Sequence, residues 1–223
     1  MKKVFIFLGP PGCGKGTQTA RLSQKLDIPH IDTGSLLRKN IQDNTPLGAE
    51  AKKYIDKGLL VPIEVVESVI KDRVKRDDCK QGFILDGFPR SVEQADALKD
   101  ILSEVTSFNL KDDAVAIYFD INNDVLIQRL VNRRSCPKCG MIYNLISSPP
   151  KIMNYCDICD TQLVQRKDDN EETARARFET YEKQTKPLLN YFEDEGILEE
   201  INADAPISDV WQNLKNVIFD EDE

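Results

Sequence analysis

The most constraining feature of this chain is an apolar segment that runs directly into a glycine-rich turn. Residues 4–8 read Val-Phe-Ile-Phe-Leu, which is typical of a buried strand, and residues 9–14 contain three glycines. Lys15 and Thr17 then open a segment, continued at 18–26, with helical character. Glycines allow backbone N–H groups to curl around an anion, a helix N-terminus offers further donors, and the lysine adds a positive charge. This order of elements predicts a phosphate-binding loop whose ligand is a nucleoside triphosphate.

The loop departs from the common P-loop pattern at one position. That pattern places Ser or Thr directly after the lysine, whereas here Gly16 intervenes and Thr17 follows. The spacing Gly9-x-x-x-x-Gly14-Lys15 is kept, so the anion cradle is intact. An ordinary glycine-rich turn is the alternative, and the ordered combination of strand, glycines, lysine and hydroxyl disfavours it.

Further apolar runs alternate with amphipathic segments along the chain. Strand character recurs at 30–31, 82–85, 115–119 and 197–201, and helical patterns lie at 65–76, 92–102 and 124–132. Continuous apolar strands between helices indicate a parallel sheet that is buried on both faces. We therefore expect an α/β fold in three layers, with a central parallel five-stranded sheet and its ligands at the carboxyl ends of the strands.

Two segments interrupt this alternation. Residues 33–61 contain helix-forming material without a convincing strand, which predicts an inserted helical subdomain. Residues 135–168 combine Pro-Pro, short alternating apolar residues and four of the six cysteines, which predicts a β-type insertion. Basic residues at 129–134 and Arg166 flank this second insertion.

The clustered cysteines form two short pairs. Cys136-Pro-Lys-Cys139 and Cys156-Asp-Ile-Cys159 are separated by 16 residues, the length of a small hairpin. Two such turns can supply four thiolates at tetrahedral geometry, which suits Zn²⁺, and four protein ligands leave no position for an activated water. The pattern therefore predicts a structural metal site. Two disulfides, or four unrelated thiols, are the alternatives, and a nucleic-acid-binding zinc ribbon is disfavoured because the insertion has no basic stripe.

Charge and length limit the partners of the chain. Its 223 residues carry 30 basic and 38 acidic side chains, a net charge of −8, which argues against a polyanion partner but not against a small anion in a local arginine cluster. The apolar run after Lys2 and Lys3 is too short for a signal peptide, and no run approaches a membrane span. We expect a soluble, cytoplasmic protein with reduced thiols, and a solvated acidic tail at 220–223.

Three residues with reactive side chains lack an obvious partner in the sequence. His30 is the only histidine, and its position before a short strand favours a structural role over catalysis. Cys13 lies within the predicted phosphate loop and Cys79 lies in a polar stretch after a helix, and no second cysteine or histidine is near either of them. We expect both thiols to be structural.

Four motifs together resemble nucleoside monophosphate kinases, and adenylate kinases in particular. They are Gly9-Pro-Pro-Gly-Cys-Gly-Lys-Gly-Thr17, Thr33-Gly-Ser-Leu-Leu-Arg38, Asp86-Gly-Phe-Pro-Arg90-Ser-Val-Glu-Gln94 and Arg166-Lys-Asp-Asp-Asn-Glu-Glu-Thr173. The cysteine-bearing insertion is similar to the zinc-bearing lid of many bacterial adenylate kinases. The resemblance extends from the N-terminus to about Phe219.

The resemblance implies a core P-loop domain of residues 1–31, 62–131 and 170–223. It implies an AMP-binding helical subdomain of residues 32–61 and a zinc-containing β lid of residues 132–169. The implied reaction is reversible transfer of the terminal phosphoryl group from MgATP to AMP, giving two ADP. Mg²⁺ would accompany ATP, a structural Zn²⁺ would be held by the four clustered cysteines, and the protein would be a monomer without nucleic-acid or membrane partners.

The resemblance also assigns site residues. The implied ATP-binding residues are Gly12, Cys13, Gly14, Lys15, Gly16, Thr17, Arg129, Arg133, Ile142, Tyr143 and Ala205. The implied AMP-binding residues are Thr33, Arg38, Leu59, Leu60, Val61, Gly87, Phe88, Pro89, Arg90, Gln94, Arg166 and Arg177. The implied catalytic residues are Lys15, Asp86, Arg90, Arg133, Arg166 and Arg177. At position 35 the family usually has an aspartate, and this chain has a serine.

The residue types suit phosphoryl transfer, which needs in-line positioning and neutralisation of charge more than covalent help. Arg129 and Arg133 are four apart on a predicted helix, which would place them on one face, able to grip one phosphate group. Arg175 and Arg177 are two apart, so we expect only one of them to face the site. Asp86 follows a predicted strand, where its carboxylate would hold the water shell of Mg²⁺.

Other functions compete with this one. A kinase for UMP or CMP is the rival within the same class, although such relatives generally carry a short lid. A GTP-dependent switch would need a guanine-reading Asn/Thr-Lys-x-Asp motif, which the sequence lacks. A nucleic-acid-binding zinc protein conflicts with the acidic balance of the chain.

Overall fold

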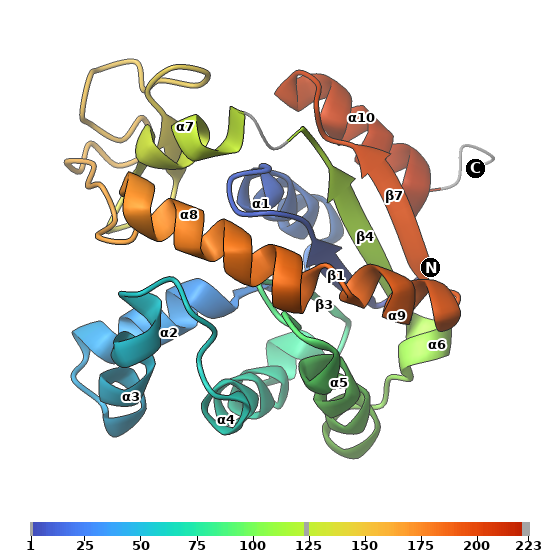
Figure 1. Cartoon of the computed structure of the whole chain (residues 1–223). Coiled ribbons are helices and arrows are strands. Elements are labelled where there is room, and N and C mark those ends of the chain that lie inside the picture. The colour runs from blue at the N-terminus through green and yellow to red at the C-terminus, as the bar shows by residue number, and fades with distance from the viewer. Residues whose placement is uncertain (1, 123–124, 220–223) are drawn as a thin grey trace.

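The computed structural model describes residues 2–122 and 125–219 of the chain. The predicted acidic tail at 220–223, and Asp124 at the start of the predicted helix 124–132, lie outside the described residues. Five parallel strands form one central sheet in the order β2-β3-β1-β4-β7 (Figure 1). They are β1 (Val4–Leu8), β2 (His30–Asp32), β3 (Phe83–Asp86), β4 (Ala114–Asp120) and β7 (Leu198–Asn202). The sequence-based prediction of a parallel five-stranded sheet is thus confirmed, and no strand end differs from the predicted one by more than one residue.

Alternating side chains of the strands build two separate cores, one on each face of the sheet. Val4, Ile6 and Leu8 of β1 point into the core packed against helices on one face, and Phe5 and Phe7 point into the opposite core. The first face is covered by α4 (Ile63–Val74), α5 (Val92–Val105) and α9 (Leu188–Asp194). The second is covered by α1 (Lys15–Leu26), α7 (Leu126–Val131) and α10 (Ile207–Ile218). These are the three expected layers.

The helical insertion consists of α2 (Thr33–Gln42) and α3 (Pro46–Ile55), which lie below the sheet edge in Figure 1. Thr45 caps α3 by accepting a hydrogen bond from the Gly48 N–H at 3.0 Å. A Cβ atom built on Gly48 would lie 2.1 Å from the Asn40 carbonyl oxygen, so only glycine allows this close approach of α3 to the end of α2.

The second insertion contains a small antiparallel sheet of β5 (Arg133–Ser135) and β6 (Ile142–Asn144). An isolated bridge between Ser135 and Val164 closes the insertion on itself, which agrees with the expected β type. Short helical segments at Leu110–Asp113 (α6) and Asp77–Cys79 complete the connections of the core.

One long helical element carries Arg175 and Arg177 and extends well beyond them. Helix α8 (Glu171–Thr180) continues through a π-helical turn (Tyr181–Thr185) toward α9 and crosses the molecule between the cysteine-bearing insertion and the lower helices (Figure 1). Thr180 Oγ1 donates to the Gly58 carbonyl at 3.2 Å, and Thr185 Oγ1 donates to the Arg90 carbonyl at 2.8 Å. This element therefore contacts segments that are distant in sequence. In the part of the chain that the structure describes, no helix combines the length and apolar character needed to cross a membrane.

Candidate active site

The glycine-rich loop lies at the carboxyl end of β1, and α1 begins at Lys15. The loop residue before it, Gly14, is the N-cap with a left-handed φ of 101°, a conformation that glycine adopts without strain. The Lys15 ammonium donates to the carbonyl oxygens of Gly9 (2.6 Å) and Pro10 (3.1 Å). The lysine is thus folded back over its own loop, where it concentrates positive charge beside the open N-terminus of α1.

Asp86 is the last residue of β3 and faces this loop. A Cβ atom built on Gly16 would lie 3.6 Å from Asp86 Oδ2 and 3.3 Å from Ile142 Cδ1. The carboxylate and one side chain of the cysteine-bearing insertion therefore both approach the start of α1. Asp86 sits inside the strand and not after it, because its backbone pairs with Phe7 of β1.

The structure corrects the expectation that His30 has no partner. His30 Nε2 lies 3.4 Å from Asp86 Oδ2, since β2 and β3 are adjacent and in register. Burial lowers the pKa of His30, but the Asp86 and Asp32 carboxylates outweigh it and raise the pKa above its ordinary value. Cys13 and Cys79 are buried free thiols, as expected of structural cysteines.

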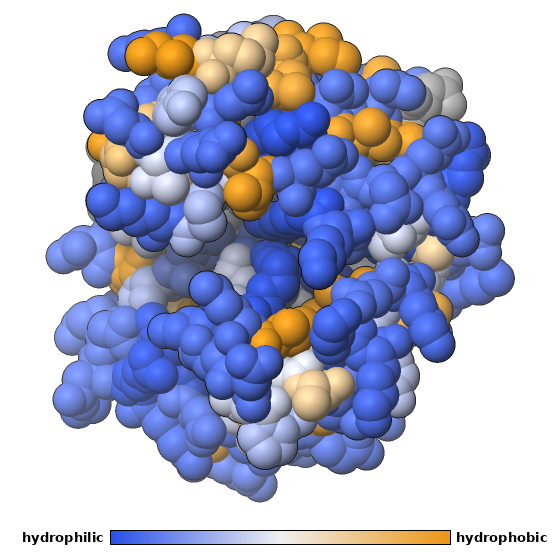
Figure 2. Space-filling model, turned by 90° about the vertical axis from the view of Figure 1, so that its left-hand side faces the viewer, coloured by the Kyte–Doolittle hydropathy of each residue, from blue (hydrophilic) through white to orange (hydrophobic). Residues whose placement is uncertain are grey.

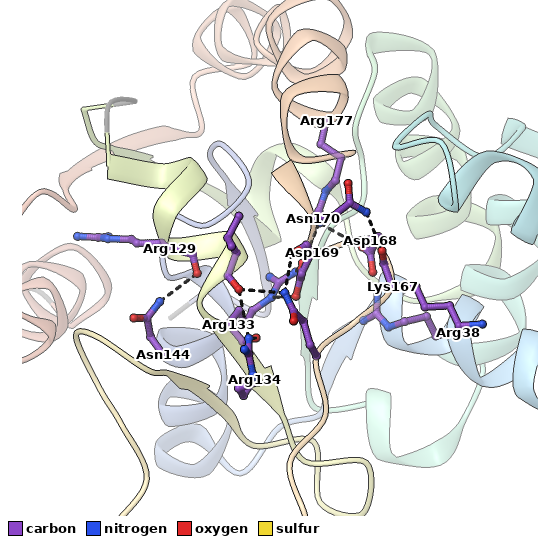
Figure 3. A network of polar contacts seen from close by, with 12 residues as sticks. Arg38, Arg129, Arg133, Arg134, Asn144, Lys167, Asp168, Asp169, Asn170 and Arg177 are labelled. Carbon is purple, nitrogen blue, oxygen red and sulfur yellow. Dashed lines mark hydrogen bonds and ion pairs between the residues drawn. The ribbon is translucent and has the colours of Figure 1, made fainter. Parts of the chain in front are cut away.

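Arginines from separate elements converge on two neighbouring aspartates (Figure 3). Arg133 Nε donates to Asp169 Oδ2 at 2.8 Å, and its terminal nitrogen binds the other oxygen of the same carboxylate. Arg177 of α8 lies 3.1 Å from Asp168 Oδ2 and 3.5 Å from Asp169 Oδ1. The Asp169 side chain is completely buried, and the two arginines replace the water that it lacks. In the sequence both aspartates appear only within the motif 166–173, and their role as arginine partners was not predicted.

The cluster holds more positive charge than its aspartates neutralise. Burial, together with the nearby charge of Arg133, lowers the pKa of Arg166 and of Arg177 to about 10. Burial also lowers the pKa of Arg90, with Arg38 adding to the effect. Guanidinium groups that repel one another in a shielded site form a receptor for a polyanion such as a chain of phosphates.

Two expectations about arginine geometry have different outcomes. The prediction that Arg129 and Arg133 share one helix face is wrong, because α7 ends at Val131 and Arg133 begins β5. In Figure 3 the Arg129 side chain points away from Arg133. The prediction that Arg175 and Arg177 diverge is confirmed, since exposed Arg175 pairs with Glu171 on the same helix while Arg177 enters the cluster.

A pocket that is open to solvent lies between the helical insertion and the core. Figure 2 shows a hollow in the largely hydrophilic surface of one face of the molecule, and the pocket itself is lined by apolar as well as charged side chains. Nine of the twelve residues that the resemblance assigned to AMP line it: Thr33, Arg38, Leu59, Leu60, Val61, Gly87, Arg90, Gln94 and Arg177. Phe88, Pro89 and Arg166 are not among the lining residues. Thr33 Oγ1 is buried without a hydrogen-bond partner among the described residues, so the pocket wall offers an unused polar group.

The turn after β3 aims Arg90 into this pocket. Arg90 Nε donates to the Gly87 carbonyl at 2.9 Å, and the Arg90 backbone N–H donates to Gln94 Oε1 at 2.8 Å. Gly87 has a φ of 81°, and a Cβ atom there would lie 2.8 Å from an Arg90 nitrogen. Glycine at this position therefore allows the guanidinium to fold close to the backbone.

The four clustered cysteines meet in one place, with all four sulfur atoms within 4.8 Å of one another. Cys136 and Cys159 are 3.4 Å apart and Cys139 and Cys156 are 3.5 Å apart at Sγ, far beyond the roughly 2.0 Å of a disulfide. Zn–S bonds of about 2.3 Å in a tetrahedron place sulfurs about 3.8 Å apart. Burial opposes ionisation of Cys156, but hydrogen bonds from Tyr143 and from backbone N–H groups outweigh it and lower the pKa of the thiol to about 6. The geometry excludes paired disulfides and fits a four-thiolate metal site.

Strand β6 separates two residues that the resemblance assigned to ATP. Ile142 reaches toward the phosphate loop, whereas the next side chain, Tyr143, is buried beside Cys156, with its hydroxyl 3.5 Å from the sulfur. The side chains of successive strand residues point to opposite faces, so the Tyr143 side chain points away from the phosphate loop. Only the backbone of Tyr143 is left to face the same side as the Ile142 side chain. Ala205 lies half-buried in the segment before α10. Gln18 of α1 donates a hydrogen bond to the carbonyl of Ile207, the first residue of α10, at 3.0 Å.

Comparison with known proteins yields one consistent family. The family model described as adenylate kinase matches residues 7–197. A protein of Clostridium botulinum strain Langeland, named adenylate kinase, is 49% identical over 214 residues, covering 96% of this chain and 97% of its own. Proteins with the same name from Clostridium kluyveri and Caldanaerobacter subterraneus subsp. tengcongensis are 46% and 45% identical, each over 96% of this chain and over 97% and 95% of their own.

Proposed function

Because the chain belongs to the adenylate kinase family, we propose that its site catalyses reversible transfer of the terminal phosphoryl group from MgATP to AMP, giving two ADP. One observation supports this site assignment most strongly. A single cluster of guanidinium groups connects the pocket, which Arg90 and Arg177 line, with Asp169 and Arg133 at the cysteine-bearing insertion. Phosphates of two nucleotides can meet in such a cluster.

The residues act by binding and orientation. Lys15 and the backbone of Gly12–Thr17 hold the phosphates of ATP, and the pocket holds AMP through Arg38, Arg90 and residues 59–61. Guanidinium forks grip equatorial oxygens in pairs and stay charged throughout, so they stabilise the charge that spreads over the transferred group. Arg129, Arg166, Ile142 and Ala205 remain proposed nucleotide contacts.

Two metals belong to this proposal. Asp86 offers carboxylate oxygens beside the phosphate loop, a donor type that suits Mg²⁺ and its bound waters. Mg²⁺ would neutralise phosphate charge when ATP is bound. The four thiols would hold Zn²⁺ in a structural role, because they fill all four tetrahedral positions.

We further infer a division into three parts. Residues 1–31, 62–131 and 170–223 form the core, residues 32–61 bind AMP, and residues 132–169 act as a lid over ATP. Closure of the lid would exclude water, so that the phosphoryl group is transferred to AMP and not to solvent. We also propose that the protein is a cytoplasmic monomer without nucleic-acid or membrane partners.

The decisive experiment is incubation of the purified protein with MgATP and AMP, with ADP followed by chromatography. We expect two ADP for each AMP consumed, and no ADP when AMP is omitted or Mg²⁺ is removed with EDTA. A panel with UMP, CMP and GMP in place of AMP tests the acceptor. Faster turnover of UMP or CMP would contradict the proposed acceptor, whereas folded protein that forms no ADP would contradict the reaction itself.

A further inference from the structure

Helix α2, which lines the pocket, has an aspartate at its N-cap position, but the carboxylate of this aspartate does not cap the helix. Asp32 is the last residue of β2 and the N-cap of α2. Aspartate is favoured at this position because its side chain usually accepts hydrogen bonds from the first free N–H groups of the helix. The Asp32 side chain accepts none of them. Its oxygens are therefore used elsewhere.

They are used by two side chains of the first helical turns. Asp32 Oδ2 accepts a hydrogen bond from Ser35 Oγ and lies 3.5 Å from Arg38 Nη2. The same Arg38 nitrogen donates to Ser35 Oγ at 3.0 Å, which closes a triangle of three groups. A Cβ atom on Gly34 would lie 3.0 Å from Arg38 Nη1 and 3.2 Å from Asp32 Oδ1. Glycine at 34 thus permits the guanidinium to fold back over the start of its own helix.

Only one member of the triangle reaches the ligand space. Arg38 lines the pocket, whereas Asp32 and Ser35 do not. Burial raises the pKa of the Asp32 carboxyl, but Arg38 and the Ser35 hydroxyl outweigh it and hold the pKa below its usual range. An ionised carboxylate behind a flexible arginine restricts its rotamers before the ligand arrives, which reduces the entropy lost on binding.

We propose that Asp32, acting through Ser35, is a positioning residue that pre-orders Arg38 for the phosphate group of AMP. This inference rests on the proposed function of the pocket. Ser35 stands at a position where the family usually has an aspartate, and in this chain the carboxylate that contacts position 35 comes from Asp32.

The test compares four variants with wild type by calorimetric titration of AMP into the protein without ATP, and by steady-state kinetics. Asp32→Asn should weaken AMP binding roughly 10-fold and raise KM for AMP by the same factor, since it removes a charge-assisted contact. KM for ATP and kcat should stay within about threefold of wild type, because Arg38 belongs to the acceptor pocket. The control Asp43→Asn removes an equal charge from the exposed far end of α2 and should bind AMP like wild type.

The exchanged variant Asp32→Ser/Ser35→Asp should bind AMP within about threefold of wild type. Serine is a favoured N-cap and an acidic residue is favoured in the first helical turn, so α2 should form even if Asp32→Asn fails to fold. AMP binding by folded Asp32→Asn that is as tight as in wild type would overturn the positioning role. The same holds for an exchanged variant that binds no better than Asp32→Ser alone. Failure of the proposed function would instead appear in the wild type, as absence of both AMP binding and ADP formation.

Discussion

At the scale of single residues, the site is dominated by arginines whose charge is only partly neutralised. Asp168 and Asp169 anchor Arg177 and Arg133 in fixed directions, while burial and mutual repulsion lower the pKa of Arg166 and Arg177. Anchored guanidinium groups lose little freedom when they bind phosphate, and the repulsion among them is relieved by the incoming anion.

The two arginines near the middle of α8 form a matched pair for testing this view. Arg177→Ala should reduce kcat/KM about 10²–10³-fold, as expected for removal of one preorganised donor. Arg175→Ala should leave kcat/KM near wild type, because Arg175 is exposed and pairs only with Glu171 among the described contacts. Thermal unfolding of both variants separates loss of catalysis from loss of fold. A change of less than threefold in the Arg177 variant would count against its catalytic assignment.

His30 makes the stability of the fold depend on pH in a defined direction. Its pKa is raised in the folded protein by Asp86, so its contribution is complete below the unfolded value of about 6.5 and is lost as pH rises through the folded value. Urea unfolding of wild type and His30→Gln at pH 6 and pH 9 should show a larger difference in unfolding free energy at pH 6. An equal difference at both values would show that the His30–Asp86 pair does not couple to folding.

At the scale of elements, the cysteine-bearing insertion has very little apolar core of its own. Its buried hydrophobic cluster consists of Cys136, Tyr143, Cys156 and Leu163. Such a small cluster cannot offset the conformational entropy of the segment, so a metal bound by the four thiols would supply most of its stability.

Removal of the metal should therefore lower the thermal stability of the protein strongly while leaving kcat nearly unchanged. Cys139→Ser should lose bound zinc, measured by mass spectrometry, and should lower Tm by at least about 5 °C. At a temperature well below that Tm, kcat should remain within a few-fold of wild type. Met141→Ser, an exposed substitution in the same insertion, serves as the control. Complete loss of turnover with the fold retained would place the metal in the reaction.

At the scale of the whole molecule, α8 and the π-helical turn contact three distant segments that line the pocket. Arg177 binds the aspartates that end the cysteine-bearing insertion, Thr180 binds Gly58 and Thr185 binds Arg90. A π-turn inserts one extra residue into a helical turn, so it rotates the residues on either side of it relative to each other. Side chains before the π-turn and side chains within it can therefore contact different segments of the chain.

Nucleotide binding should consequently order the two insertions together. We expect amide hydrogen exchange of residues 132–169 to slow most when ATP and AMP are both present, because the arginine cluster is complete only then. Exchange in β1 and β4 at the centre of the sheet should not change. Equal protection of the lid by ATP alone would show that AMP is not needed for closure.

The sequence alone determined the parallel sheet, the phosphate loop and the four-cysteine cluster. In each case the information is local: buried strands are continuously apolar, the loop needs glycines in order before a lysine, and metal ligands come in closely spaced pairs. The tertiary structure alone decided the pairing of charges. Arg133 binds Asp169, which is 36 residues further along the chain. His30 of one strand pairs with Asp86 of the neighbouring strand. The Asp32 carboxylate pairs with Arg38 and does not cap its helix. Partners of this kind are chosen by proximity in the folded chain, and no local pattern of residue types distinguishes them from solvated surface charges.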